Sequence, residues 1–362
     1  MHPAIDGRTA LLGLLLVTLT AALRPSPVAA GTAFGLQAGD RMLVGKNEDG
    51  ISGDAALIVN PRGLMRQAAP PRRGKPARWV ARYGSVTFNR HGPGFPSGGL
   101  NEAGLVVESL RHDDAQYPDP DGRPALGCLE WVQYQLDTAA SIDDVIAGER
   151  RVRIDSVVPL HFLVADDRGR VAAVEFVDGR AVVDTGAGLP VRVLSDATYA
   201  AALRHLAALD SAGRAAGDGI DSLARFARAA RRVHDAKPPP ASDPLALAFA
   251  TLAEVTQGSF TEWSIVYDLG RRRVHFRTRR RPQVRHLDLQ PLDFHCTSPS
   301  IGVDLDAELA GPIDAALRPL PPELDRAAVR SRSTEIVAPN ARETAELERR
   351  AGQRPPARCL DR

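Results

Sequence analysis

The chain of 362 residues has only three cysteines, three methionines and 5% aromatic residues. Cys128, Cys296 and Cys359 are far apart and odd in number, which excludes a disulfide framework and leaves at most one bridge, with the pairing open. They also lack the close spacing of a zinc site, and we expect neither a metal nor another cofactor. The 44% hydrophobic content still provides ample material for one large domain or two small ones.

The chain has almost no surplus charge, with a formal net charge of +2, so its total charge implies no polyanionic partner. The most basic stretch, residues 271–281, alternates arginine with Val274, Phe276 and Thr278. That alternation favours a strand with one solvated basic face over a nucleic-acid or anionic-lipid site. We therefore expect no nucleic-acid partner.

The apolar run Ala10–Leu23 is too short to span a bilayer comfortably. It follows Arg8 and precedes two prolines and the small residues Val28, Ala29 and Ala30, which is the order of a secretory signal peptide. An uncleaved anchor helix is the alternative, but the prolines and small residues after the run favour cleavage. We predict that residues 1–30 are removed and that the product is periplasmic or secreted, with no membrane span.

The rest of the chain alternates runs of strands with runs of helices. Strands are predicted at residues 31–37, 41–49, 55–59, 79–89, 106–110, 160–166, 171–177, 181–185, 262–268 and 273–278, and helices at 126–136, 199–209, 223–233 and 245–255. A regular βαβ pattern is missing, so we expect an α+β fold of antiparallel sheets covered by helices. From about Val303 charge and proline dominate, which predicts a domain at 31–304 and a peripheral charged tail with loose helices at 305–362.

Several short stretches occur in an order that resembles the choloylglycine hydrolase and penicillin V acylase family. They are GTAF at 31–34, GKNED at 45–49, NPRG at 60–63, GLNEAGL at 99–105, EWVQYQL at 130–136, HFLVAD at 161–166, VLSD at 193–196, ARF at 224–226 and WSIVYD at 263–268. The resemblance implies a four-layer αββα sandwich, the N-terminal-nucleophile hydrolase fold. It also implies hydrolysis of linear amides such as those of bile salts, penicillin V and acylated lactones. In such enzymes an N-terminal cysteine attacks and its own α-amine takes the proton.

The resemblance places the nucleophile at Gly31, which has no side chain. An arginine that positions the terminus corresponds to Lys46, which keeps the charge but loses the bidentate fork. Its partner aspartate is retained as Asp49, and a second arginine near the nucleophile is retained as Arg225. The family pattern is thus altered at the essential position.

The two asparagines of the family's oxyanion hole correspond to Asp196 and, less securely, to Arg111, which we expect to bind substrate. An ionised carboxylate at Asp196 would repel a developing oxyanion. These departures argue against the cysteine mechanism without affecting the predicted fold.

Thr32 offers another nucleophile if cleavage occurs after Gly31, since a terminal threonine can use its own amine as base. Successive strand residues face opposite sides, however, so Thr32 should point away from the side that Gly31 faces. For Lys46 and Asp49 the alternatives are a surface ion pair worth under about 1 kcal/mol and a clamp on the α-amine. Arg225 by itself fits the solvated face of a helix.

Other polar residues carry less information. His161 and His275 lie within predicted strands, where core or surface positions are more common than ligand positions. Glu175 lies in the apolar strand VAAVEFV and has no partner that the sequence identifies.

Two functions follow from these observations. The first is an exported amidase that acts on a small acylated amide or lactam, through Thr32 or through an arrangement that the sequence does not reveal. The second is a pseudoenzyme that binds such a molecule without cutting it, because hydrolysis is impaired or lost at Gly31. The resemblance also suggests a homo-oligomer.

Overall fold

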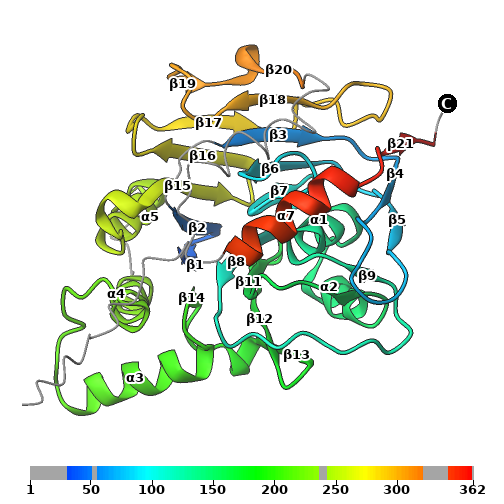
Figure 1. The fold of residues 1–362 in the computed structure, drawn as a ribbon. Coiled ribbons are helices and arrows are strands. Elements are labelled where there is room, and N and C mark those ends of the chain that lie inside the picture. Colours follow the sequence, from blue (N-terminus) through cyan, green and yellow to red (C-terminus); the bar gives the residue numbers. More distant parts are fainter. Residues whose placement is uncertain (1–30, 51–54, 236–242, 321–340, 361–362) are drawn as a thin grey trace, which may run out of the picture.

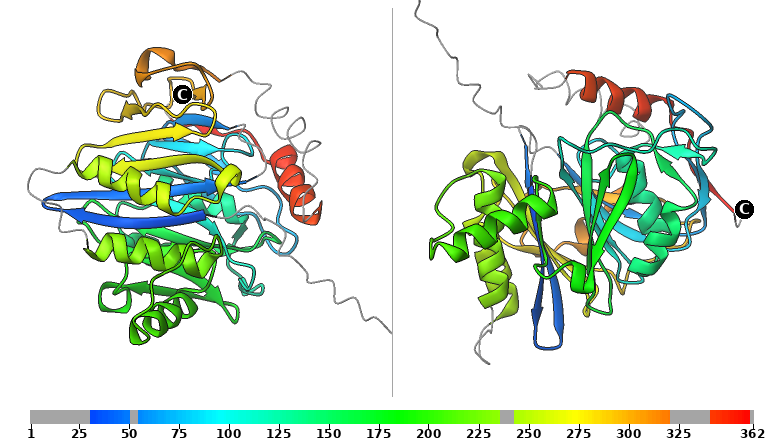
Figure 2. Two further views of the ribbon diagram at one scale, coloured as in Figure 1. Left: turned by 90° about the vertical axis from the view of Figure 1, so that its left-hand side faces the viewer. Right: turned by 90° about the horizontal axis from the view of Figure 1, so that it is seen from below.

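The computed structural model describes residues 31–50, 55–235, 243–320 and 341–360, so the predicted signal peptide lies outside the described residues. Two large sheets lie face to face, and helices cover the outer side of each (Figure 1). The view from below in Figure 2 shows helices α3, α4 and α5 on one side, the β1–β2 hairpin between the layers, and α1 with α7 on the other side. The predicted four-layer αββα sandwich is confirmed.

The first sheet has seven strands and is antiparallel except at its last pair. In spatial order it consists of β14 (Val193–Ser195), β1 (Gly31–Ala38), β2 (Arg41–Asp49), β15 (Thr261–Asp268), β16 (Arg273–Thr278), β17 (Arg285–Asp288) and β19 (Gly311–Pro312). The chain's first described strand therefore lies inside the sheet, between β14 and β2.

The second sheet has nine antiparallel strands. In spatial order it consists of β13 (Arg180–Thr185), β12 (Val171–Val177), β11 (Leu160–Ala165), β8 (Val106–Arg111), β7 (Gly98–Asn101), β6 (Ser85–Asn89), β3 (Ala56–Asn60), β18 (Ile301–Asp304) and β20 (Arg318–Pro319). There are also two small sheets. One consists of β21 (Arg358–Cys359), β4 (Leu64–Gln67) and β5 (Arg78–Val80), and the other of β9 (Ala125–Leu126) and β10 (Arg153–Ile154). The predicted meander at 160–185 is present as β11, β12 and β13.

Helices form the two outer layers. The helices beside the seven-stranded sheet are α3 (Tyr199–Ser211), α4 (Ser222–Asp235) and α5 (Pro244–Glu254), and those beside the nine-stranded sheet are α1 (Cys128–Thr138), α2 (Ile142–Glu149) and α7 (Ala341–Gln353). Short 3-10 turns occur at η1 (Gly186–Gly188), η2 (Gly258–Phe260) and η3 (Asp314–Ala316). Among the described residues, no helix is both long and apolar enough to cross a membrane.

Apolar side chains form two buried clusters, as a layered sandwich requires. The first lies between the sheets and extends under α3, α4 and α5; there Phe88 packs edge-on against Tyr267 and Phe276. The second lies under α1 and α2 and is built around Trp131 and Phe162, whose rings stack at 4.2 Å. Each sheet is therefore buried on both faces near its centre.

The β1–β2 hairpin forms because its residues alternate around a tight turn. Gly39 has a φ of 63°, in the left-handed region that glycine enters without steric cost. The register pairs Gly31 with Glu48 and Ala38 with Arg41. This hairpin, predicted at the same residues, fixes which side chains near Gly31 share a face.

One strand prediction is wrong. Residues 79–89 form two strands, β5 and β6, which belong to different sheets. Between them the chain turns at the end of α1, where the N–H groups of Arg82 and Tyr83 donate to the carbonyl oxygen of Asp137. The alternating pattern continues across this turn, so periodicity alone did not show the break.

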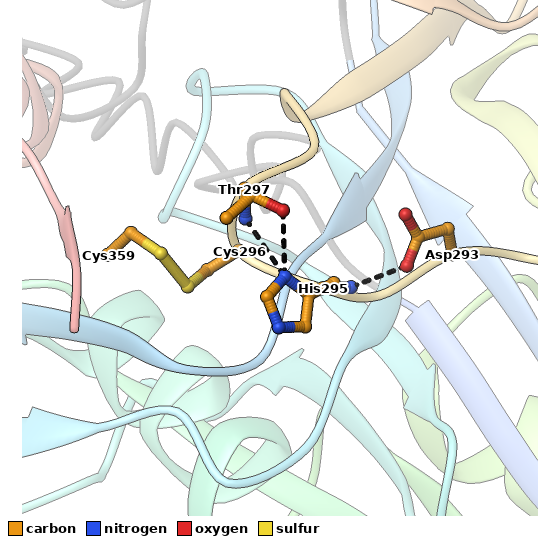
Figure 3. The surroundings of a disulfide bond; sticks show 5 residues. All are labelled: Asp293, His295, Cys296, Thr297 and Cys359. Carbon is orange, nitrogen blue, oxygen red and sulfur yellow. Dashed lines mark hydrogen bonds between the residues drawn. A yellow bond between two sulfur atoms is a disulfide. The ribbon is translucent and has the colours of Figure 1, made fainter. Parts of the chain in front are cut away.

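The described part of the C-terminal segment packs more closely than a peripheral tail would. Cys296 and Cys359 form a disulfide across 63 residues of chain, which resolves the pairing that the sequence left open (Figure 3). The loop beside Cys296 is held by the His295 N–H, which donates to Asp293 Oδ1 at 2.9 Å. Residue spacing could not reveal this bridge, because the two cysteines meet only in the folded chain.

Helix α7 is also held by a buried arginine. Arg350 is 1% exposed and contacts the carboxylates of Glu346, Glu130 and Asp155 at 2.7, 3.2 and 3.6 Å. Glu130 belongs to α1, so this cluster joins the C-terminal helix to the outer helical layer. The third cysteine, Cys128, begins α1 and is free and buried.

Candidate functional site

The start of β1 presents two different surroundings on its two faces. Directly paired residues of neighbouring strands share a face, and the register pairs Gly31 with Glu48, Thr32 with Asn47 and Ala33 with Lys46. Gly31 therefore shares the face of Lys46 and Glu48, which we call the inter-sheet face. Thr32 lies on the opposite face, toward α4, which we call the helix face.

Arg225 dominates the helix face. From α4 its Nη1 donates to the carbonyl oxygen of Gly31 at 2.7 Å and to Thr32 Oγ1 at 2.6 Å. The same guanidinium forms ion pairs with Asp196 and, at 3.7 Å, with Asp49. Arg225 is 2% exposed, so it does not lie on the solvated face that its helical pattern suggested.

Asp196 holds the other polar group of Gly31. It follows β14, and its Oδ1 accepts a hydrogen bond from the Gly31 N–H at 2.8 Å. The structure thus brings together Gly31, Thr32, Asp49, Asp196 and Arg225 from three separate parts of the chain. Both backbone polar groups of Gly31 are bound by charged side chains, and this fixes the position of the residue.

Asp49 is the most deeply buried acid of this group. Its Oδ1 accepts from Thr261 Oγ1 at 2.5 Å, and its Oδ2 accepts from Gln257 Nε2 at 2.8 Å. Burial raises the pKa of Asp49 to about 7, although the Arg225 guanidinium opposes this shift. At neutral pH this carboxyl therefore exchanges between its charged and neutral forms.

Lys46 is buried on the inter-sheet face. Its Nζ donates to the carbonyl oxygen of Ser109 at 2.6 Å and to Glu48 at 3.0 Å, and it lies 3.7 Å from Glu108. Burial would lower the pKa of Lys46, but the carboxylates of Glu48 and Glu108 outweigh it and the net pKa is raised. Lys46 is consequently a cation rather than a neutral amine that could attack a substrate.

Glu108 completes this buried group from β8. Burial raises its pKa to about 7, against the lowering effects of Lys46 and of the Tyr267 hydroxyl, which donates to Glu108 Oε1 at 2.5 Å. Lys46 and Asp49 contact different partners on opposite faces of β2, so neither the predicted surface ion pair nor a joint clamp describes them.

A side chain at Gly31 would point directly at Lys46. An added Cβ would lie 2.8 Å from Lys46 Cε, 3.3 Å from Lys46 Nζ and 2.8 Å from the carbonyl oxygen of Asn47. The two contacts at 2.8 Å are too close for carbon, so a larger residue requires both Lys46 and the backbone at Asn47 to shift. The place of a nucleophile is therefore occupied by the lysine stem.

Arg111 has a different set of contacts from the one expected of a substrate-binding residue. It lies at the end of β8, where its guanidinium forms two hydrogen bonds with the carboxylate of Glu343 in α7, at 2.7 and 3.1 Å, and one with Asp113 at 2.6 Å. The structure uses Arg111 to attach the C-terminal helix to the nine-stranded sheet.

The sequence interpretation missed Glu48, Glu108 and Ser109 as neighbours of Lys46, and Thr261 and Gln257 as neighbours of Asp49. Strand alternation could have identified Glu48, because residues two apart on a strand share a face. The others come from β8 and from the chain around β15, and only the sheet topology brings them near.

Comparisons with known proteins support the resemblance. No family model matches the chain. A penicillin V acylase from Pectobacterium atrosepticum is 29% identical over 122 residues, which cover 29% of this chain and 32% of that protein, so the chain spans about a third of the length of this relative.

Three solved structures share the fold. Penicillin V acylase from Agrobacterium tumefaciens has a TM-score of 0.70 at 24% identity, over 80% of this chain and 98% of the other. Two variants of conjugated bile acid hydrolase from Clostridium perfringens have TM-scores of 0.62 and 0.63 at 18% and 17% identity, over 73% and 78% of this chain and 94% and 98% of theirs. The expected resemblance to the choloylglycine hydrolase and penicillin V acylase family is therefore confirmed.

Proposed function

We propose that the chain is an exported choloylglycine hydrolase-like protein that binds a small acylated amide or lactam without hydrolysing it. The observation that carries the proposal is the inter-sheet face of Gly31, where the glycine offers no nucleophile and the Lys46 stem fills the space of one. The retained helix face supports it too, because Arg225 and Asp196 still hold the backbone of Gly31 as if to present that residue.

Asp196 adds a second reason for lost hydrolysis. If the leader is cleaved after Ala30, the Gly31 nitrogen becomes an ammonium 2.8 Å from a carboxylate. A carboxylate at that distance favours the charged form of an amine, and a charged amine is no base. The same carboxylate would repel the negative charge that develops on a substrate oxygen during acyl transfer.

Thr32 is poorly placed to supply the missing nucleophile. Its side chain is fully buried, and its hydroxyl accepts the Arg225 hydrogen bond on the helix face. An attacking hydroxyl must instead be free to approach a substrate carbonyl. We therefore keep the Thr32 amidase as the alternative that the experiment must exclude.

Export is the first part to test. The full chain is expressed in a bacterial host, the periplasm and medium are separated from the cytoplasm, and the exported protein is examined by intact mass and N-terminal sequencing. We expect a terminus at Gly31. Ala30→Tyr should block cleavage after residue 30, because signal peptidase requires a small residue there, while still permitting cleavage after Gly31. A cytoplasmic, full-length product contradicts export.

The exported protein is then assayed with penicillin V, glycine-conjugated bile salts and acyl-homoserine lactones. We expect no turnover, together with saturable binding of at least one of these compounds by titration calorimetry. Turnover by protein with an intact Gly31 terminus overturns the proposal. A Thr32 terminus with activity that Thr32→Ala abolishes and Thr32→Ser retains would establish the amidase instead. Failure of all three compounds to bind contradicts the binding function. The homo-oligomer stays a prediction.

A further inference from the structure

Three potential metal ligands meet inside the nine-stranded sheet. His161 lies on β11 and Glu175 on β12, and His112 follows the last residue of β8. The His112 N–H donates to the carbonyl oxygen of Pro159 at 3.1 Å, which continues the β8–β11 pairing to this residue. One ligand atom from each of the three side chains lies within 4.8 Å of the other two.

All three side chains are buried, with exposed fractions of 1% for His112, 0% for His161 and 4% for Glu175. The imidazole rings of the two histidines stack with centroids 4.8 Å apart. His161 Nδ1 lies 3.0 Å from Glu175 Oε1, and the Tyr199 N–H donates to both oxygens of the same carboxylate at 3.0 and 3.2 Å. The carboxylate is therefore already oriented by the start of α3.

Three of the four ring nitrogens of this cluster have no hydrogen-bond partner in the described part of the protein. Both nitrogens of His112 and Nε2 of His161 are buried without a hydrogen-bond partner. A buried polar atom without a partner costs about 1–3 kcal/mol, so three in one cluster require an explanation. A bound ion that accepts nitrogen lone pairs would remove part of this cost.

We propose that His112, His161 and Glu175 bind one divalent transition-metal ion, for which Zn²⁺ is the best match. Two imidazoles and one carboxylate are a common zinc ligand set, with the fourth position left for water. Bonds of about 2.0–2.2 Å in tetrahedral geometry place ligand atoms roughly 3.4 Å apart, so the side chains must draw together from separations of up to 4.8 Å. This proposal is independent of the proposed function at Gly31.

The charge around the cluster suits a cation. Glu175 brings a carboxylate into the cluster, held by the Tyr199 N–H. The aspartates Asp113 and Asp114 next to His112 add negative charge.

A bound ion would connect four elements of the fold. Its ligands come from β11, β12 and the end of β8, and Glu175 is hydrogen bonded to the first residue of α3. Ligands that bind only the folded state stabilise it by mass action. The ion would therefore act as a staple between the nine-stranded sheet and a helix that lies beside the other sheet.

The test uses the protein as purified from the expression host, stripped of metal with a chelator and dialysed against Zn²⁺. We expect one tightly bound zinc per chain by elemental analysis and a higher melting temperature in the presence of zinc. His112→Gln is the critical variant, because the His112 ring has no hydrogen bond to lose, the backbone bond to Pro159 is kept, and the metal-free protein should fold normally. Its zinc affinity should fall by more than the 10–100-fold that a change outside the ligand shell produces.

His286→Gln serves as the matched control, since it changes a histidine of the seven-stranded sheet whose ring lies 5.6 Å from that of His275. It should bind zinc as the unmodified protein does. Co²⁺ provides an independent readout, because a tetrahedral site gives strong visible absorption that His112→Gln should abolish. Absence of stoichiometric zinc in the unmodified protein overturns the proposal, as does equal zinc binding by His112→Gln.

Discussion

Arg225 and Arg350 are both almost fully buried among carboxylates. In the folded protein Arg225 contacts Gly31, where the described chain begins, and Arg350 lies in the helix near its C-terminal end. Arg225 contacts Asp49, Asp196 and the backbone of Gly31, whereas Arg350 contacts Glu130, Glu346 and Asp155. The difference lies in what else holds each end. Strand β1 is fixed inside a sheet with its polar groups bound by the Arg225 cluster. Helix α7 is also held by the Arg111–Glu343 pair, and β21, which follows it, is held by the disulfide.

We expect the two arginines to contribute differently to the free energy of unfolding. Removal of Arg225 leaves Asp49 and Asp196 uncompensated beside β1, which is paired on both sides within the seven-stranded sheet. Removal of Arg350 leaves acids that water can reach if α7 lifts away, since α7 lies on the outside of the molecule (Figure 1). Equal burial therefore does not imply equal contributions to stability.

The largest effect is expected for Arg225→Ala. It should lower the free energy of unfolding by about 3–5 kcal/mol, the usual result of removing one partner of a buried ion pair. Urea unfolding followed by circular dichroism measures this. The control is Arg232→Ala on the same helix, whose half-exposed pair with Glu254 should contribute less than about 1 kcal/mol. Equal losses in the two variants would contradict the comparison.

The disulfide should rank next. Cys296→Ser with Cys359→Ser is expected to cost about 2–4 kcal/mol, because the bridge restricts the unfolded chain over a 63-residue loop. The unfolding midpoint in urea is measured with and without reductant. The unmodified protein in reductant should match the double variant, and the double variant should not respond to reductant. A midpoint that ignores reductant in both proteins would show that the bridge contributes nothing.

Arg350→Ala should have a smaller effect, about 1–3 kcal/mol, while the disulfide is intact. Hydrogen exchange by mass spectrometry resolves its location. We expect faster exchange in α7 and unchanged exchange in β1, and the reverse for Arg225→Ala. If both variants accelerate exchange in both regions, the two clusters are coupled and our distinction between them is wrong.

The last prediction concerns pH rather than the removal of a contact. The pKa of Asp49 is raised from 3.8 to about 7, so the folded state binds this proton more tightly than the unfolded state does. Its contribution to stability is full below pH 3.8 and is lost as the pH rises through 7. Asp49→Asn should therefore make the free energy of unfolding fall less between pH 4 and pH 7, in urea titrations at several pH values. The exposed Asp119→Asn should leave the slope unchanged.

The sequence predicted the parts of this comparison that depend on local patterns. Alternation around Gly39 gave the β1–β2 hairpin and placed Thr32 opposite Gly31, and the order of strands and helices gave the α+β sandwich. Arg225 was singled out only through its Ala-Arg-Phe context, because its helical pattern alone indicates a solvated position.

Contacts between residues far apart in the chain could not be predicted from the sequence. Arg350 and Cys359 lie in a charged, proline-rich segment whose composition resembles that of a tail, and their partners Glu130 and Cys296 are 220 and 63 residues away. Lys46 and Asp49 appeared to be neighbours because they are three residues apart, yet the strand directs them to opposite faces. Contacts of this kind depend on topology, which no single stretch encodes.

Cys128 is a free thiol whose reactivity reports whether the helical layer around α1 has opened. Its thiol is 1% exposed and lies 3.3 Å from Ser156 Oγ, and burial raises its pKa to about 11, so almost no thiolate exists in the closed protein. It begins α1, the helix whose Glu130 pairs with Arg350. The other two cysteines form a disulfide, so in the folded protein a thiol reagent can react only with Cys128. It can do so only when the helical layer that contains α1 opens, and the rate of labelling therefore measures how often that layer opens.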